Sequence, residues 1–200
     1  MIEVMSEPGL RERKKARTRR AILQATLRLV QAQGYDATTV EQIAAEAEVS
    51  PSTFFRYFPT KEDAILEDEY DPLIVAALGS QAADLPPLEA ARRAFGELFG
   101  TIYERDRDQL YLRMRLWIEV PAIRARMADS MRDAEDLMAA AMARQLGHDE
   151  VGFDVQMAAA AVMGTMGRAI VIWAQDGGTG DLPAMLDRAL ALLQGGLELR

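Results

Sequence analysis

The sequence predicts an all-α fold in which a small N-terminal three-helix helix-turn-helix unit precedes a larger antiparallel helical bundle. Half of the 200 residues are hydrophobic, and the helix-favouring residues alanine, leucine, glutamate and arginine are abundant. Apolar residues recur at helical spacing between breakers, whereas no segment shows the alternation that is typical of a strand. We therefore expect two domains, residues 1–62 and residues 63–200.

The first two helices are bounded by signals at their ends. A helix over residues 10–33 is followed by Gly34, and glycine readily adopts the left-handed conformation found after helix C-termini. Thr39 and Gln42 form a capping box, in which each side chain bonds the backbone N–H of the other residue. A short second helix is therefore expected after Thr39, ending near residues 46–48.

Two further caps define the next pair of helices. Ser50 caps a third helix over residues 51–58, which begins with a proline; proline is tolerated there because the first N–H of a helix has no partner within it. Thr60 and Asp63 form another capping box. They predict a fourth helix that continues to Ala77.

The remainder of the chain reads as five longer helices separated by prolines and glycines. Short connections between such helices favour a bundle around one apolar core. The expected helices span residues 88–106, 108–119, 122–146, 153–175 and 183–197.

The charge of the chain is divided unevenly. Residues 1–61 carry 10 basic and 7 acidic groups, whereas residues 62–200 carry 13 basic and 24 acidic groups. Seven of the ten residues from 11 to 20 are lysine or arginine. A basic N-terminal segment followed by an acidic remainder suits a protein whose small N-terminal domain binds an anion such as DNA. Arg17 and Thr18 lie well inside the first helix and are placed to meet phosphate, whereas Arg11 and Arg13 fit a solvated tail equally well.

The third helix fits the recognition helix of a helix-turn-helix, which lies in the major groove with its N-terminal residues at the base edges. Phe54 and Phe58 are four residues apart and are expected to pack into the core. Among the other side chains, an arginine can bond guanine, hydroxyls can bond either donors or acceptors of a base, and a phenyl ring can contact the thymine methyl. The expected DNA-binding residues are Arg17, Thr18, Thr38, Thr39, Ser50, Pro51, Ser52, Thr53, Phe55, Arg56, Tyr57 and Lys61. The same local pattern also occurs as a packing motif without DNA.

Residues 18–66 resemble the TetR family of bacterial transcriptional regulators. The resemblance is carried by a G-Y-x-x-T-T-V-x-x-I-A run from Gly34 and a V-S-x-x-T-F-F-R-Y-F-x-x-K-E run from Val49, without a gap. Family members usually carry a tyrosine that binds phosphate at the position of Phe55, so Phe55 must act by shape or apolar contact. Tyr57 stands where a histidine is common, and its hydroxyl keeps a phosphate bond available.

The segment RYFPTKEDAILEDEYDP further resembles the mycofactocin-system branch of that family. This branch implies a long-chain fatty acyl coenzyme A thioester as effector. The family as a whole implies a small-molecule pocket between the middle helices of the second domain.

The second domain supplies apolar side chains for such a pocket. Several phenylalanines and isoleucines recur at helical spacing, and methionines are flexible enough to adapt to a ligand. A plain bundle core accounts for each of these residues taken singly. The expected effector-binding residues are Phe95, Phe99, Ile102, Met114, Trp117, Met138, Met142, Met163 and Met166.

The helix expected over residues 153–175 predicts a homodimer. It is apolar on opposite faces, and Gly164 and Gly167 permit close approach of another helix. With the helix over residues 183–197 it would form a four-helix seam with a second copy. Arg168 has two interpretations: it pairs with an acid across the seam, or it faces the pocket and binds an anionic group of the effector.

No catalytic, metal or cofactor site is expected. The chain has no cysteine and a single histidine, His148, which excludes thiolate and multi-histidine zinc sites. It shows no nucleophile set or phosphate-binding glycine loop. The apolar run over residues 155–174 is long enough to span a membrane, but Gln156 and Arg168 favour a helix buried in protein. Without a visible signal peptide, a cytoplasmic location is expected.

These observations predict a ligand-responsive repressor that binds a near-palindromic DNA operator. An apolar molecule would enter the second domain and tilt the fourth helix, which begins with Lys61 beside phosphate. The sequence leaves open whether the effector releases or strengthens DNA binding. Two other classes are a protein-interaction module with a basic head and, with less support, a helical enzyme; selective DNA binding excludes the first and absence of turnover the second.

Overall fold

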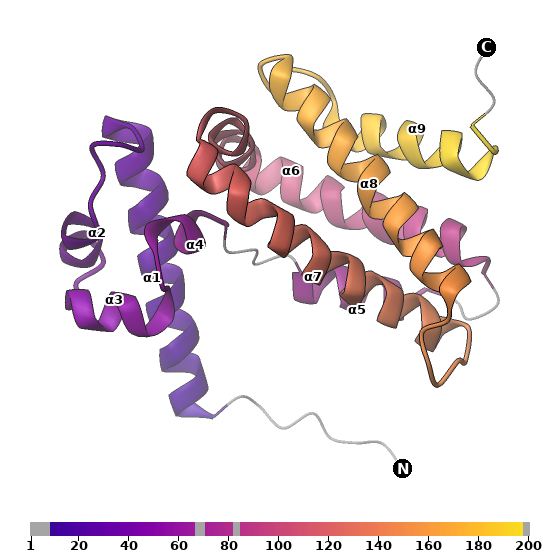
Figure 1. Ribbon diagram of the computed structural model, residues 1–200, viewed down its shortest axis with the longest axis horizontal. Helices are drawn as coiled ribbons and strands as arrows, with labels where there is room; N and C mark the ends of the chain where they lie inside the picture. The colour runs from indigo at the N-terminus through magenta and orange to yellow at the C-terminus, as the bar shows by residue number, and fades with distance from the viewer. Residues whose placement is uncertain (1–8, 67–70, 82–84, 198–200) are drawn as a thin grey trace. The chain divides into compact units, whose positions relative to one another are not determined.

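The computed structural model describes residues 9–66, 71–81 and 85–197 of the chain (Figure 1). In this part of the chain every regular element is a helix, as predicted from the sequence. Contacts between residues divide the chain into two compact units, Met1–Glu67 and Asp68–Arg200. Each unit has its own apolar core, so each is described by itself.

The N-terminal unit contains four helices. They are α1 (Leu10–Gln33), α2 (Val40–Glu46), α3 (Pro51–Tyr57) and α4 (Lys61–Leu66). Helix α2 packs against α1 and α3, and α4 packs against α1 (Figure 1). These contacts bury a compact apolar cluster that joins all four helices, consisting of Ile22, Ala25, Ile43, Ala44, Phe54, Phe58 and Ala64.

The helix starts of this unit are held by the caps that the sequence predicts. Thr39 Oγ1 accepts the Gln42 N–H at 3.3 Å, and Gln42 Oε1 accepts the Thr39 N–H at 3.0 Å. Ser50 Oγ accepts the Thr53 N–H at 3.1 Å. Each bond satisfies a donor that the helix itself leaves without a partner. The boundaries of α2 and α3 are therefore set by short-range chemistry.

The turn between α2 and α3 places Glu48 in the left-handed region, with φ of 55°. The Val49 N–H donates to the Ala44 carbonyl at 2.9 Å and the Glu48 N–H to the Ala45 carbonyl at 3.1 Å. These two bonds define a Schellman motif, in which the left-handed position is usually glycine. A residue with a Cβ is strained there, so the left-handed conformation of Glu48 lowers the stability of the turn.

The second unit is a helical bundle of five described helices. They are α5 (Asp71–Gly79), α6 (Pro87–Glu119), α7 (Pro121–Gln145), α8 (Phe153–Gln175) and α9 (Leu182–Gln194). Helix α8 packs against α6, α7 and α9, and α5 packs against α6 and α7. Every buried side chain among the described residues of this unit is hydrophobic.

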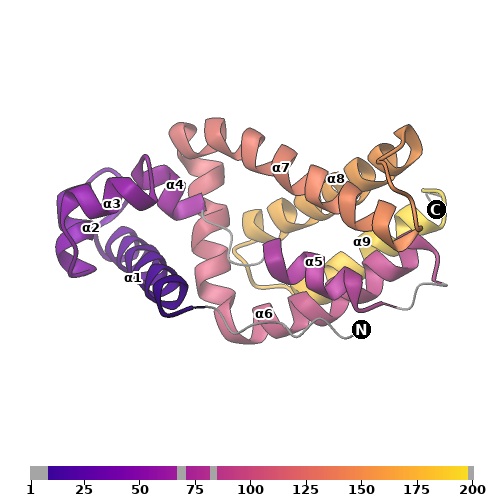
Figure 2. The same cartoon turned by 90° about the horizontal axis from the view of Figure 1, so that it is seen from below.

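Two boundaries differ from those expected. The helix predicted from Lys61 to Ala77 corresponds to two described helices, α4 and α5, and residues 67–70 lie outside the described part. The helices predicted over 88–106 and 108–119 form one element, α6, which bends at Asp106 (φ −125°, ψ 20°; Figure 2). The sequence signal at this point therefore marks a bend and not a loop.

Helix α8 is long and apolar enough to cross a membrane by length and composition, but only 33% of its most apolar window is buried within the chain. One side of α8 belongs to the core, and the other side is exposed. Within a single copy of the chain, α8 is therefore buried on one side only.

Replacing Glu48 with glycine should raise the free energy of unfolding of the N-terminal unit by about 0.5 kcal/mol, because relief of left-handed strain exceeds the added freedom of the unfolded chain. The matched control is Ala45→Gly, which introduces glycine into the exposed interior of α2 and should lower the same free energy by about 1 kcal/mol. Urea unfolding followed by circular dichroism measures both. Equal effects of the two substitutions would contradict the assignment of strain to Glu48.

Candidate nucleic-acid interface

Helix α3 has one buried and one exposed face. Phe54 is completely buried and Phe58 is 1% exposed, as predicted from their spacing. Their ring centroids lie 5.9 Å apart, and the Arg19 guanidinium covers the Phe58 ring at 4.9 Å. This packing fixes the rotation of α3 about its own axis. It therefore decides which of its side chains face solvent.

The exposed face of α3 combines an apolar ring with a guanidinium. Phe55 is 53% exposed, and its ring meets the Phe54 ring edge-on at 5.5 Å. Arg56 is also exposed, with its guanidinium 5.5 Å from the Tyr57 ring, while Tyr57 is partly buried against the core. A phenyl ring contacts a thymine methyl and a guanidinium bonds guanine, so this face carries groups suited to base edges in a major groove.

Three hydroxyls gather at the start of α3. Ser50 Oγ lies 2.8 Å from Ser52 Oγ and 2.9 Å from Thr53 Oγ1. Ser50, Pro51 and Ser52 are exposed, and Thr53 is partly buried. A hydroxyl donates one bond and accepts two, so the group keeps capacity for a further polar partner besides capping the helix.

Thr38 does not lie on this surface. It is 1% exposed, and its hydroxyl donates to the Gly34 carbonyl at 2.8 Å. The structure thus gives Thr38 a role in the loop between α1 and α2, and we remove it from the candidate DNA contacts. Thr39, the next residue, remains exposed at the start of α2.

Lys61 is also committed to that loop. Its ammonium donates to the Tyr35 carbonyl at 2.9 Å and to the Thr38 carbonyl at 3.0 Å, and lies 3.9 Å from the Tyr35 ring centroid. A lysine held by two carbonyls and an aromatic face has little freedom to reach a phosphate. We therefore interpret Lys61 as a positioning residue, in place of the expected phosphate contact.

Glu62 makes a third hydrogen bond to the same loop. The Tyr35 hydroxyl donates to the Glu62 carboxylate. Burial by itself raises the pKa of Glu62, but the hydrogen bond from Tyr35, local backbone and Thr60 bonds and the charge of Lys61 together lower it below its ordinary value. Burial and then the Glu62 carboxylate raise the pKa of Tyr35. Three hydrogen bonds thus join the first turn of α4 to the α1–α2 loop.

Sequence reasoning missed this pairing. Tyr35 stands 26 and 27 positions before Lys61 and Glu62, and no periodic pattern links such distant positions. The ion pair between Arg28 and Glu46, which joins α1 to α2 at 3.1 Å, was missed for the same reason. The only sequence signal was that Gly34-Tyr35 and Lys61-Glu62 belong to the two motif runs quoted above.

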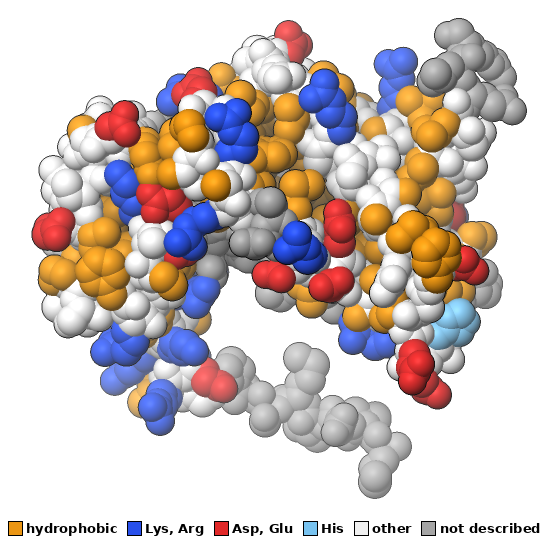
Figure 3. Space-filling model, in the orientation of Figure 1, with side chains coloured by type: hydrophobic (Ala, Val, Ile, Leu, Met, Phe, Trp, Pro, Cys, Tyr) orange, Lys and Arg blue, Asp and Glu red, His pale blue; other side chains and the backbone are white. Residues whose placement is uncertain are grey.

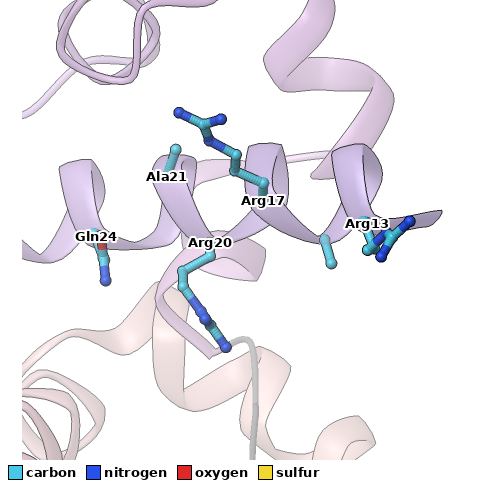
Figure 4. A pocket seen from close by; sticks show the side chains of 6 residues that line it. Arg13, Arg17, Arg20, Ala21 and Gln24 are labelled. Atoms are coloured by element: carbon cyan, nitrogen blue, oxygen red, sulfur yellow. The ribbon is translucent and has the colours of Figure 1, made fainter. Parts of the chain in front are cut away.

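The first turns of α1 form a basic surface (Figure 3). A shallow hollow beside the helix is lined by Arg13, Arg17 and Arg20, with Ala16, Ala21 and Gln24. Arg17 and Arg20 point in opposite directions from α1 (Figure 4). These arginines therefore present a distributed positive charge and do not converge on one ligand. Thr18 is partly buried, and its hydroxyl donates to the Lys14 carbonyl at 3.0 Å.

The expected effector residues lie mostly in the core of the second unit. Phe95, Phe99, Met138, Met142 and Met166 are buried in one apolar cluster, against which Met114 and Met163 pack while partly exposed. Ile102 is buried outside that cluster, and Trp117 is partly buried. The sequence thus identified apolar positions at the centre of the bundle, contributed by α6, α7 and α8.

Comparisons with family models match most of the chain. Residues 22–67 match the model of bacterial regulatory proteins of the tetR family, and residues 85–198 match the model of the MftR C-terminal domain. The second match agrees with the mycofactocin-type resemblance predicted from the sequence.

Two curated relatives are transcriptional regulators. The HTH-type transcriptional regulator TcmR of Streptomyces glaucescens is 36% identical over 149 residues, which cover 71% of this chain and 66% of TcmR. The HTH-type transcriptional repressor KstR of Mycolicibacterium smegmatis is 34% identical over 80 residues, 40% of this chain and 35% of KstR. The chain thus spans less than two thirds of the length of these relatives.

Solved structures share the fold. The TetR family repressor FadR of Thermus thermophilus, in complex with lauroyl-CoA, is 27% identical with a TM-score of 0.61, covering 91% of this chain and 96% of that one. FadR of Bacillus subtilis, in complex with stearoyl-CoA, is 20% identical with a TM-score of 0.61, covering 87% and 96%. The second likeness supports the fold alone.

The bond from Tyr35 to Glu62 should make the N-terminal unit sensitive to acid. Because the pKa of Glu62 is lowered in the folded state, its stabilisation is present above the ordinary value of 4.5 and is lost as the pH falls through the lowered value. The difference in free energy of unfolding between the wild type and Glu62→Gln should therefore shrink between about pH 6 and about pH 3. Urea unfolding at each pH measures it.

The control for this experiment is Glu41→Gln, which alters an exposed glutamate of α2. A pH-independent difference for Glu62→Gln, or an equal pH dependence for Glu41→Gln, would contradict the role given to the Tyr35–Glu62 bond.

Proposed function

Because the chain belongs to the TetR family of bacterial regulatory proteins, we propose that it is a repressor that binds a near-palindromic operator and is released by an apolar small molecule. The observation that carries the proposal is the exposed face of α3, where Phe55 and Arg56 stand outside a core formed by Phe54 and Phe58. An exposed phenyl ring next to an exposed guanidinium gives one helix face both an apolar contact and a hydrogen-bond donor for base edges, and a DNA-binding role accounts for this combination.

The two exposed groups of α3 would read different bases. Phe55 has no hydroxyl and would contact a thymine methyl, whereas Arg56 would bond the O6 and N7 atoms of guanine. The basic surface on α1, including Arg17, would contact phosphates and set the register of α3 without reading sequence. Lys61 and Thr38 would act indirectly, by holding the loop that precedes α2.

A second copy of the chain would cover the exposed side of α8. Phe153 is 72% exposed, Met157 49% and Ile172 44%, and Leu192 of α9 is 42% exposed. One row of exposed residues along α8 recurs every three or four positions, at Phe153, Met157, Ala161, Gly164, Arg168 and Ile172. An apolar stripe of this kind packs well against its own two-fold copy. A dimer would place two α3 helices about 34 Å apart, one turn of DNA.

The position of Arg168 bears on its two interpretations. It is exposed and lies on the same stripe of α8 as Met157 and Gly164, on the side away from the core. A place in the seam, paired with an acid of the second copy, is therefore favoured over contact with an effector in the core.

The effector would enter the apolar core of the second unit. The buried residues described for this unit are all hydrophobic, so the part of a ligand that lies among them must be apolar. Phe99 of α6 and Met138 and Met142 of α7 are central to it. A fatty acyl chain satisfies this requirement, and FadR of Thermus thermophilus was solved with lauroyl-CoA.

Release of DNA would follow from a shift of α4. Helix α5, which belongs to the bundle, follows α4 in the chain, and the first turn of α4 is bonded through Lys61 and Glu62 to the α1–α2 loop. A displacement of α4 would thus move the segment that leads into α2 and α3. For a 100-fold loss of DNA affinity, the effector must favour the released state by about 2.7 kcal/mol.

Two arginines should behave differently in DNA binding. Arg56→Ala should weaken binding to the operator by about 1–3 kcal/mol and relax the preference for guanine at one position. Arg17→Ala should weaken binding to all sequences and lower the slope of log affinity against log salt by about 1. Fluorescence anisotropy on DNA upstream of the gene and its neighbours measures both. Failure of the wild type to prefer any fragment over competitor DNA would favour an interaction module and sink the proposal.

Lauroyl-CoA should lower the affinity of the wild type for its selected fragment at least about 10-fold, which corresponds to about 1.4 kcal/mol. Coenzyme A alone should have little effect, because it cannot fill an apolar core. The same anisotropy assay with each compound tests this. Unchanged affinity would discard the acyl thioester as effector, and increased affinity would reverse the sign of the mechanism.

A further inference from the structure

The turn between α8 and α9 is bonded to α6 on both sides of its bend. Tyr103, before the bend, donates its hydroxyl to the Gly180 carbonyl at 2.6 Å. Arg107, after the bend, donates to the Gly178 carbonyl at 2.6 Å. Trp173 of α8 donates its indole N–H to the Gly180 carbonyl at 3.0 Å. Three side chains thus converge on two carbonyls of one short turn, residues 176–181.

Aromatic packing closes the same assembly. Trp173 is completely buried, and its ring lies 6.0 Å from both Tyr103 and Tyr111, edge-on to each. Tyr103 and Tyr111 come from the two segments of α6 on either side of Asp106. The indole is therefore held between both segments and carries the turn with it. We call Tyr103, Arg107, Tyr111, Trp173 and the turn at 176–181 the turn clamp.

The backbone of the turn fits closely into the clamp. Gly177 and Gly178 both have positive φ, 70° and 67°. A Cβ on Gly178 would lie 2.6 Å from Tyr111 Cδ2, whereas a Cβ on Gly177 would meet only Thr179 Cγ2, at 3.9 Å. The two glycines thus share the same backbone requirement, but only Gly178 is in contact with α6. This pair separates strain in the turn from loss of the clamp.

The bend in α6 needs such support. Because Asp106 departs from helical φ and ψ inside α6, regular helix geometry does not by itself set the angle between the two segments, and tertiary contacts contribute to it. The segment before the bend carries Phe95 and Phe99, which lie in the apolar core, and the turn joins α8 and α9. The clamp is therefore one of the contacts that join α6 to α8 and α9, and it lies at the bend of α6.

We infer that the turn clamp couples the bend of α6 to the α8–α9 pair, so that a ligand which shifts the first segment of α6 also alters subunit association. The coupling rests on the dimer and effector core under "Proposed function". In the free protein it predicts that α6 around its bend and the turn open together as one unit. Allosteric coupling of this type requires an element that both sites bias, and the bend is that element.

The test compares Gly178→Ala with Gly177→Ala in the full chain without effector or DNA. Hydrogen exchange followed by mass spectrometry reports residues 99–111 and 176–182, and sedimentation reports subunit association. Gly178→Ala should raise exchange at least about 10-fold in both segments relative to Gly177→Ala, and should weaken association at least about 10-fold.

A second variant covers the case in which Gly178→Ala does not fold. Arg107→Met removes the guanidinium that bonds the Gly178 carbonyl and keeps most of the side-chain length, and Arg115→Met on the exposed side of α6 is its control. Arg107→Met should raise exchange in the turn as well as in α6, whereas Arg115→Met should leave the turn unchanged.

The inference that the turn and the bend of α6 open together would be contradicted by either of two results. One is increased exchange confined to the turn in Gly178→Ala, and the other is equal exchange in Arg107→Met and Arg115→Met. Normal association of a variant whose two segments exchange faster would overturn its coupling to the seam. A monomeric wild type would instead refute the dimer itself, and the exchange comparison would still decide the clamp.

Discussion

The N-terminal unit depends on the burial of Phe54 and Phe58 against α1 and α2. Two phenyl rings four residues apart anchor α3 along one edge, and a helix held in this way cannot rotate. Phe55 and Arg56 are exposed for the same reason that their neighbours are buried. The loop before α2 is then held by Thr38, Lys61 and Glu62, whose polar groups are consumed inside the unit. The residues proposed for DNA recognition and those that support the fold are thus different members of the stretch from residue 38 to residue 62.

The second unit is built on a different constraint. The buried residues described for it are all hydrophobic, so its core offers apolar contact with little hydrogen-bond selectivity. The effector proposed for this core would be selected by size and hydrophobicity, which suits an acyl chain better than a sugar or a nucleotide. Exposed polar groups also join the helices of this unit, as in the pairing of Arg92 of α6 with Asp187 of α9, where Arg92 Nε lies 2.6 Å from a carboxylate oxygen. Directional contacts hold the helices together around a core that does not itself specify a ligand.

Local signals predicted the helices of the N-terminal unit well. The Thr39–Gln42 capping box, the Ser50 cap and Gly34 each act over three or four residues, and each lies where expected. The same reasoning placed Thr38 on the surface and Lys61 at a phosphate, because residue type and motif position do not reveal where a side chain points. Burial of Thr38 follows from how α1 and α2 meet, which no local pattern records.

By itself the sequence determined the fold class, the helix caps, the pairing of Phe54 with Phe58 and the family resemblance, since all of these depend on neighbouring residues or short motifs. The tertiary structure decided the partners of Lys61 and Glu62, the bend of α6 at Asp106 and the attachment of the α8–α9 turn to Tyr103 and Arg107. The hydrogen bonds among these features join residues separated by 23 to 77 positions. Hydrogen bonds over such separations form only when whole helices are packed, so their geometry belongs to the folded chain.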